Sequence, residues 1–268
     1  MLHTDAAFRK PREIRRHDET VREKSSAVGR SGLTAAQCST AITSLLSLVP
    51  GRFSSELGLV LSPRRPRDLF LWFLAAILYG ARISGSIVVK THSEFLRRNL
   101  TSPDRIVNTG WDGLVEALDA GGYVRYDFKT ATKLLEVMNN LISRYGGDLK
   151  TLHDAAADAR DLETRLKLLG KGIGDVTVQI FLRELRGIWP KARPTLSPLS
   201  ILAGRDLDLF STDGGGGRIT VDWLRVLWKQ AGVKGKTFSD FESALVRLGR
   251  DYCRQRRTHD CPMREYCA

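Results

Sequence analysis

Cysteine is scarce in this sequence, with four residues in 268, and no apolar run is long enough to cross a membrane. A small secreted domain stapled by disulfides would carry many more half-cystines, so this class is excluded. The longest apolar stretch, residues 69–81, is shorter than the roughly 20 residues of a spanning helix and predicts a buried helix. Residues 9–30 carry dense charges of both signs and lack the apolar segment of a secretory signal. We therefore expect a protein of the reducing cytoplasm.

Acidic residues are outnumbered, because 30 Asp and Glu stand against 42 Lys and Arg. The formal net charge is +12 and the pI is about 9.8. A chain this basic predicts an acidic polymer as its partner, and nucleic acid is favoured over a membrane surface. Aromatic residues make up 8% of the chain and form no stacking motif of the usual RNA-binding kind.

The sequence also lacks a sustained alternating strand pattern, whereas apolar residues recur at helical spacing in ten segments. Glycine and proline separate these segments, for example at Gly146-Gly147 and in the run Gly214–Gly217. Residues 1–34 hold few apolar side chains to offset the entropy of ordering and are expected to form a mobile charged tail. We expect an all-α fold with helices at residues 35–48, 69–79, 84–97, 111–119, 128–144, 161–168, 176–185, 199–207, 221–231 and 238–248.

A glycine-rich turn joins two of the expected helices at residues 168–178, with the sequence LLGKGIGDVTV. Gly172 and Gly174 allow positive φ angles and a close approach of the backbone. The second helix begins here, so its free N–H groups and positive dipole end suit a phosphate, with Thr177 in the first turn. The turn has neither the ending of a Walker loop nor a preceding strand. It predicts a nucleic-acid-binding hairpin, with an ordinary helical hairpin as the alternative.

Three of the four cysteines, Cys253, Cys261 and Cys267, lie within the last 16 residues. Such clustering indicates a metal or iron–sulfur loop. His259 lies between them and is an ordinary soft-metal ligand through a neutral imidazole nitrogen. The alternative is a loop of reduced thiols that holds no metal. The same loop is rich in arginines that would contact a phosphate backbone, namely Arg254, Arg256, Arg257 and Arg264.

The hairpin and the cysteine loop together resemble the endonuclease III family of DNA glycosylases. The hairpin is close to the family signature L-P-G-V-G-x-x-T-A, and the cysteine loop follows about 80 residues later. Cys261 and Cys267 match the end of the family pattern C-x6-C-x2-C-x5-C and Cys253 takes its first position, but the second cysteine is missing. The resemblance covers roughly residues 66–268. It implies a [4Fe–4S] cluster on Cys253, His259, Cys261 and Cys267, with zinc or no metal as alternatives.

The resemblance implies a two-lobed helical protein with double-stranded DNA across the cleft. A barrel lobe would span residues 79–196 and contain the hairpin at 168–185, and a flanking lobe would combine residues 35–78 with 197–268. Glycosylases extrude the target nucleotide, because the bond to be cut is inaccessible within the stack. Arg125 aligns with the residue that fills the gap and Arg82 with a second such residue; phosphate contacts are the alternative for both. The other DNA contacts that the resemblance implies are Gly170, Lys171, Gly172, Gly174, Thr177, Arg254, Arg256 and Arg257.

The catalytic positions of the family are altered. Bifunctional members carry a Schiff-base lysine where this sequence has Val176, so a lyase step through that residue is not expected. The family's aspartate should fall within residues 193–199, which contain no carboxylate. Asp127 and Tyr126 are the replacement candidates, although Asp127 is also suited to cap the helix that follows.

The sequence thus predicts a DNA glycosylase that flips and excises a damaged or modified base by a monofunctional reaction. The alternative is a catalytically inactive protein that binds DNA structures or lesions on the same scaffold. For either reading we expect a monomer in the cytoplasm, associated with the nucleoid.

Overall fold

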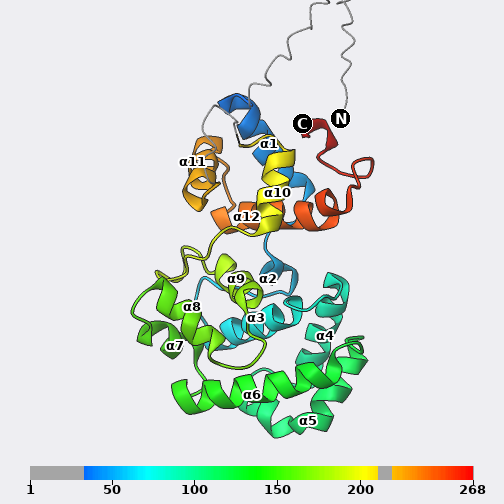
Figure 1. The fold of residues 1–268 in the computed structure, drawn as a ribbon, viewed down its shortest axis with the longest axis vertical. Helices are drawn as coiled ribbons and strands as arrows, with labels where there is room; N and C mark the ends of the chain where they lie inside the picture. Colours follow the sequence, from blue (N-terminus) through cyan, green and yellow to red (C-terminus); the bar gives the residue numbers. More distant parts are fainter. Residues whose placement is uncertain (1–32, 211–218, 268) are drawn as a thin grey trace, which may run out of the picture. The chain divides into compact units, whose positions relative to one another are not determined.

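The computed structural model describes residues 33–210 and 219–267 (Figure 1). Within these ranges the chain forms twelve α-helices and two short 3₁₀ helices and has no β-strand, so the predicted all-α class is confirmed there. The described residues belong to one compact unit. Most of the predicted tail and the run Gly214–Gly217 lie outside the described residues. Thr34, the last residue of that tail, caps the first helix by accepting a hydrogen bond from the N–H of Gln37.

Helices α2 to α9 enclose the first of two apolar cores. Helix α3 runs through this core, with every residue from Leu69 to Leu78 buried. A helix that is apolar on all sides needs neighbours all round, and α4, α7 and α9 pack against it. The helices of this core are α2 (Phe53–Glu56), α3 (Pro66–Tyr79), α4 (Gly85–Arg97), α5 (Pro103–Ala120), α6 (Asp127–Tyr145), α7 (Leu149–Ala155), α8 (Ala159–Lys167) and α9 (Asp175–Glu184).

The second core joins the beginning and the end of the described chain. Helix α12 crosses α10 closely at Gly249, where a Cβ would collide with the carbonyl oxygen of Leu199. Figure 1 shows α1, α10, α11 and α12 gathered apart from the helices of the first core. Their bounds, with those of the two 3₁₀ helices, are α1 (Ala35–Leu48), α10 (Pro198–Asp206), α11 (Val221–Ala231), α12 (Phe238–Asp251), η1 (Cys253–Gln255) and η2 (Arg264–Tyr266).

The division between the cores differs from the predicted one in one segment. The prediction placed residues 35–78 in the flanking lobe, whereas the first core begins at Phe53 and includes α3. The reason is the uniformly apolar surface of α3, which can be covered only by helices on several sides. Residues 38–49 and most buried residues after 196 share the second core, whereas Val246 belongs to the first.

A buried polar network connects the two cores. The Glu184 carboxylate, at the end of α9, accepts hydrogen bonds from the N–H groups of Phe53 at 2.7 Å and Ser54 at 2.9 Å. The Ser243 hydroxyl of α12 donates to the same carboxylate at 3.4 Å. Arg186, just after α9, pairs with Glu242 of α12 at 2.8 Å, and both side chains are buried. No described helix has the length and apolar character to cross a membrane.

Candidate functional site

The predicted hairpin lies between α8 and α9, and side chains of α6 donate hydrogen bonds to it. The Asn140 side-chain amide donates to the Leu169 carbonyl at 2.8 Å, and Arg144 donates to the Leu168 carbonyl at 3.1 Å. Gly172 adopts a φ of +91°, a conformation that glycine permits and other residues avoid. No described side chain caps the N-terminus of α9 at Gly174. The N–H groups of the first turn of α9 therefore remain available to an external acceptor.

A lysine from α6 stands beside this turn. A Cβ on Gly172 would lie 2.9 Å from Cε and 3.3 Å from Nζ of Lys133. Partial burial lowers the pKa of Lys133 from its ordinary value. The hairpin thus combines uncapped amides with a nearby cationic side chain. Lys133 is a residue that the sequence did not identify, because only the fold brings α6 to the hairpin.

The other hairpin residues divide between surface and core. Gly170, Lys171, Gly172 and Gly174 lie together in the turn, and the Lys171 N–H donates to the Glu136 carboxylate at 3.0 Å. Thr177 is instead buried, with its hydroxyl against Gly80. Its side chain contacts the end of α3, so this predicted DNA contact faces the interior.

A pocket of about 760 Å³ opens beside the first turns of α9. Val176, the residue at the family's lysine position, lines it and is 60% exposed. Two exposed arginines from the predicted set, Arg82 and Arg254, also line it. Arg183 and Arg250 line its interior, and no described Asp or Glu does. The pocket is therefore cationic and has no carboxylate at its wall.

The floor of this pocket is aromatic. The Phe53 ring is approached by the guanidinium carbons of Arg247 at 3.8 Å, Arg183 at 5.1 Å and Arg250 at 5.2 Å. Tyr79 meets Phe53 edge to face at 5.3 Å between ring centroids. Burial, the largest cause, raises the pKa of Tyr79 to about 12, so its hydroxyl remains a proton donor at neutral pH.

The structure keeps the predicted catalytic pair apart from the pocket. Asp127 is the first residue of α6, and its carboxylate accepts a hydrogen bond from the N–H of Phe128 at 2.7 Å. Its charge also raises the pKa of nearby Asp119, after the larger effect of desolvation. Tyr126 lies under the Arg125 guanidinium at 5.3 Å in the turn before α6. None of these residues lines the pocket, so their roles stay predictions.

The cysteine loop brings three thiols together but not the predicted histidine. Burial, Asp206 and the other two thiols raise the pKa of Cys253, and burial with Cys261 and Asp206 raises that of Cys267 to about 11. The His259 side chain is 79% exposed and pairs with Asp260 at 3.2 Å. No group of three or more His, Cys, Asp and Glu in the described ranges is arranged to hold a metal ion.

The predicted four-ligand site, Cys253, His259, Cys261 and Cys267, therefore does not fit the described geometry. The physical reason is that the His259 side chain is exposed to solvent, whereas Cys261 is buried and Cys253 and Cys267 are half-buried. The loop's other arginines lie outside the pocket, with Arg256 at a left-handed φ of 53° and Arg257 paired with Asp260 at 2.9 Å.

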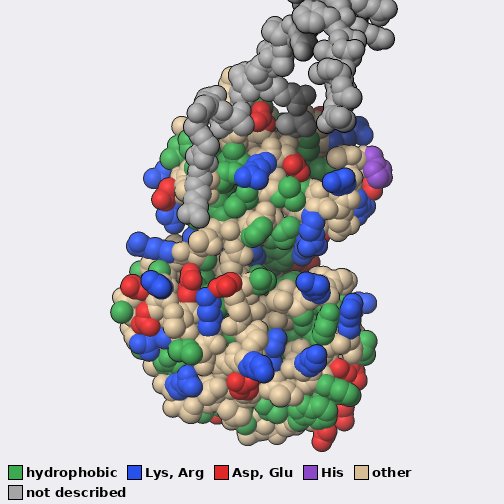
Figure 2. Space-filling view, viewed as in Figure 1, with side chains coloured by type: hydrophobic (Ala, Val, Ile, Leu, Met, Phe, Trp, Pro, Cys, Tyr) green, Lys and Arg blue, Asp and Glu red, His purple; other side chains and the backbone are tan. Residues whose placement is uncertain are grey.

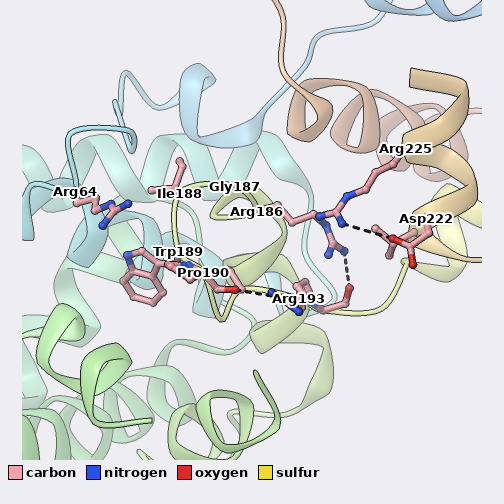
Figure 3. Close-up of a pocket in the computed structure, with 12 residues that line it drawn as sticks. Arg64, Arg186, Gly187, Ile188, Trp189, Pro190, Arg193, Asp222 and Arg225 are labelled. Carbon is pink, nitrogen blue, oxygen red and sulfur yellow. Dashed lines mark hydrogen bonds and ion pairs between the residues drawn. The ribbon is translucent and has the colours of Figure 1, made fainter. Parts of the chain in front are cut away.

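A second pocket, of about 570 Å³, lies on the loop after α9 (Figure 3). Arginines line it as well, but most already have acceptors. Arg186 binds Glu242 and the carbonyl of Pro194, Arg193 donates to the Pro190 carbonyl at 3.2 Å, and Arg225 pairs with Asp222 at 3.5 Å. Arg186 and Arg193 hold the loop in place, and the Arg225 pair lies within α11, so we regard the pocket beside α9 as the candidate site.

Comparison with solved structures finds DNA glycosylases of similar fold. The chain is similar to a thermostable thymine-DNA glycosylase, with a TM-score of 0.49 and 16% identity, covering 87% of this chain and 96% of that chain. It is also similar to endonuclease III in a trapped covalent intermediate with DNA, with a TM-score of 0.48 and 16% identity over 88% and 96% of the two chains. No protein-family model and no curated protein matches the sequence. Both structures are of DNA glycosylases, the class of protein that the two sequence motifs resemble.

Proposed function

We propose that the protein binds double-stranded DNA and excises a damaged or modified base that it extrudes into the pocket beside α9. One observation carries the proposal. The uncapped first turn of α9 is part of the hairpin, and Val176 in the same turn lines the pocket. A phosphate bound at that helix end would place its own nucleotide at the mouth of the pocket. The volume of about 760 Å³ is in the range of sites for small ligands.

The charges suit this assignment, although they do not form a single patch. Figure 2 shows Lys and Arg side chains spread over the face that it presents, with Asp and Glu between them. The interface is therefore located by the hairpin, Lys133, Arg82 and Arg254 rather than by charge alone. Arg125, beside Tyr126 in the turn before α6, remains the proposed wedge into the base stack.

The reaction in this proposal is hydrolytic. Val176 has no amine to attack the sugar, so water and not an enzyme nucleophile would replace the base. Arginine and tyrosine donors line the pocket together with the polar side chains of Gln179 and Ser197, and such groups suit the binding of a base. The three thiols of the cysteine loop do not line the pocket, so this proposal assigns them no step in the reaction.

One observation favours a second candidate, a protein that binds lesions without cutting them. No described carboxylate lines the pocket, and a carboxylate beside the sugar is what the resemblance leads us to expect. The two candidates predict the same DNA binding and differ in base release.

The test is a panel of duplexes, each with one modified base, incubated with the full chain and then treated with hot alkali to reveal abasic sites. Strand breaks at a modified base, with little borohydride-trapped protein, would support the monofunctional glycosylase. Lesion-specific binding without breaks on any duplex would support the binder.

A pair of valine substitutions ties the result to the pocket. Val176→Trp should block the pocket and lower base release while leaving salt-dependent binding to undamaged duplex in place. Val60→Trp is the matched control, because Val60 is 55% exposed and lies outside the pocket. Equal base release by both variants would show that the pocket does not take part in the reaction.

A further inference from the structure

Two residues that line the pocket carry a buried donor with no acceptor among the described residues. The Arg183 side chain is 3% exposed, and its Nε has no hydrogen-bond partner within the described residues. The Tyr79 hydroxyl is likewise buried and unpartnered there. Both residues line the same pocket. Buried donors are nearly always paired in folded proteins, so two in one cavity call for an explanation.

The nearest carboxylate does not satisfy Arg183. Glu184 Oε1 lies 3.7 Å from an Arg183 nitrogen, beyond a good hydrogen bond. Its two oxygens already accept from the N–H groups of Phe53 and Ser54 and from the Ser243 hydroxyl. Glu184 is therefore engaged in holding α2 and α12, and the Arg183 guanidinium keeps donor capacity for a ligand.

The charged side chains that line the pocket are all arginines, one of which, Arg250, pairs with Asp251 at 2.6 Å. Exposed Arg82 and Arg254 add to Arg183 and Arg250, and no described carboxylate lines the wall. Such a pocket attracts a group rich in hydrogen-bond acceptors and repels a cation. Among modified bases, oxidised and deaminated bases present carbonyl oxygens, whereas several alkylated purines carry a positive charge.

Resting on the proposed function, we propose that Arg183 and Tyr79 select a carbonyl-bearing base and stabilise the negative charge it acquires as the glycosidic bond breaks. The C1′–N bond breaks with its electron pair moving to the base nitrogen, and the base leaves as an anion held by these donors. Water then forms a bond from its oxygen to C1′, and its released proton ends on the departed base. The products are an abasic site and the neutral base, so the step needs water alone.

This arrangement explains how base release proceeds without a carboxylate beside the sugar. Stabilising charge on the leaving base lowers the same barrier that a carboxylate lowers from the sugar side. Donors preset in a buried site act strongly because little reorganisation is needed when the charge develops. The phenol of Tyr79 and the guanidinium of Arg183 both remain donors at neutral pH.

The first measurement compares base classes with the unmodified protein. Duplexes carrying uracil, 5-fluorouracil or 5-formyluracil should lose the base at least about tenfold faster than duplexes carrying 7-methylguanine or 3-methyladenine, because the arginines repel the two cationic purines. Faster release of the two cationic purines would overturn the inference and leave the proposed function intact. Release of no base from any duplex would instead contradict the proposed function.

The second measurement uses Arg183→Lys and Tyr79→Phe. Each should slow uracil release by about 10- to 100-fold, which is the effect expected from losing one hydrogen bond to a developing charge. The loss should be smaller for 5-fluorouracil, because a more acidic base needs less help to leave. This difference between two nearly isosteric bases is a signature that a purely structural role would not produce.

The control is Arg186→Lys. Arg186 is also buried, but it pairs with Glu242 at 2.8 Å and lines the second pocket instead of the candidate site. It should lower thermal stability and leave the uracil to 5-fluorouracil ratio unchanged. If Arg183→Lys does not fold, Tyr79→Phe and the comparison of base classes still decide. An unchanged ratio in Tyr79→Phe together with no preference between base classes would refute the inference.

Discussion

His92 is a buried histidine in α4 whose Nε2 has no partner among the described residues. Burial, followed by the positive charge of Arg67, lowers its pKa to about 4. An unfolded histidine titrates near 6.5, so between these values the unfolded chain binds more protons than the folded chain. Folding stability should therefore fall as the pH drops through this window.

The expected loss from His92 is about 2.5 kcal/mol between pH 7 and pH 4.5. Urea unfolding at the two pH values measures it, and His92→Gln should flatten the difference because glutamine does not titrate. Glu94 pairs with Arg97 and Arg98, which lower its pKa from 4.5 to about 2, so most of its contribution to stability is lost below pH 4.5. Equal pH dependence in the variant and the parent would contradict the assignment to His92.

Val176 allows a prediction about the missing lysine. Its side chain faces a pocket lined by four arginines, and neighbouring positive charges lower the pKa of a lysine amine. Val176→Lys should therefore gain a reactive amine and form a borohydride-trapped adduct with duplex containing an abasic site. Val60→Lys, at a similarly exposed position away from the pocket, is the control. No gain over the parent would show that the helix end does not face the sugar.

At the scale of elements, the two hairpin glycines differ in what a methyl group would do. Gly172→Ala should cost about 1 to 2 kcal/mol of stability, because its φ of +91° is unfavourable for alanine. A methyl at Gly174 meets nothing within 4 Å and needs no unusual φ, so this variant should fold normally. It should still weaken binding to every duplex about fivefold to tenfold, because the methyl occupies the space of the phosphate.

Circular dichroism with fluorescence anisotropy separates these effects for the two variants. Gly232→Ala is a control for Gly172→Ala, because Gly232 also has a positive φ, at 61°, but ends α11 away from the hairpin. Unchanged affinity in Gly174→Ala would remove the hairpin from the interface.

The C-terminal loop allows a prediction on metal content. With the His259 side chain in solvent, three thiols lack the fourth ligand that zinc or a [4Fe–4S] cluster takes. We expect anaerobically purified protein to hold no stoichiometric iron or zinc. His259→Ala should leave the melting temperature unchanged, whereas Cys261→Ser should lower it, because Cys261 is buried in the second core. A brown protein, or one zinc per chain lost in His259→Ala, would contradict this.

The sequence predicted helices well where the apolar period was uninterrupted. Helix α1 has the bounds that its period indicated, Ala35–Leu48. Helix α5 was expected only from Trp111, because Gly110, with a φ of 72°, breaks the period within the helix. The hairpin was also foreseen, since glycine spacing is a local property. The pocket was foreseen only in part, through Arg82, Arg254 and Val176.

At the scale of the whole molecule, the pocket could not be read from the sequence. Residues from α2, α3, α9 and α12 form its floor. These helices lie far apart in the sequence, from Phe53 at the start of α2 to Asp251 at the end of α12. Arg183 looks like an ordinary surface arginine near the end of a helix, and only tertiary packing buries it. The same packing fixes Glu184, whose neighbours in space are Phe53 and Ser243.

Glu184 is therefore the residue on which the joining of the two cores should depend most. Glu184→Ala leaves two buried N–H groups of α2 without an acceptor and removes the charge nearest Arg183. Each buried N–H left without an acceptor costs about 1 to 3 kcal/mol, so urea unfolding should show a loss of about 2 to 6 kcal/mol. Glu184→Gln should lose less, because its amide oxygen still accepts one of the two hydrogen bonds.

Glu116→Ala is the matched control, because the Glu116 side chain is 70% exposed and pairs with Arg98 only at 3.4 Å. Surface pairs of this kind contribute at most about 1 kcal/mol, so this variant should unfold almost as the parent does. Hydrogen exchange adds a local readout, since the amides of Phe53 and Ser54 should exchange faster in Glu184→Ala than in Glu116→Ala. Similar stability of Glu184→Ala and Glu116→Ala, with both amides still protected, would show that apolar packing alone joins the two cores.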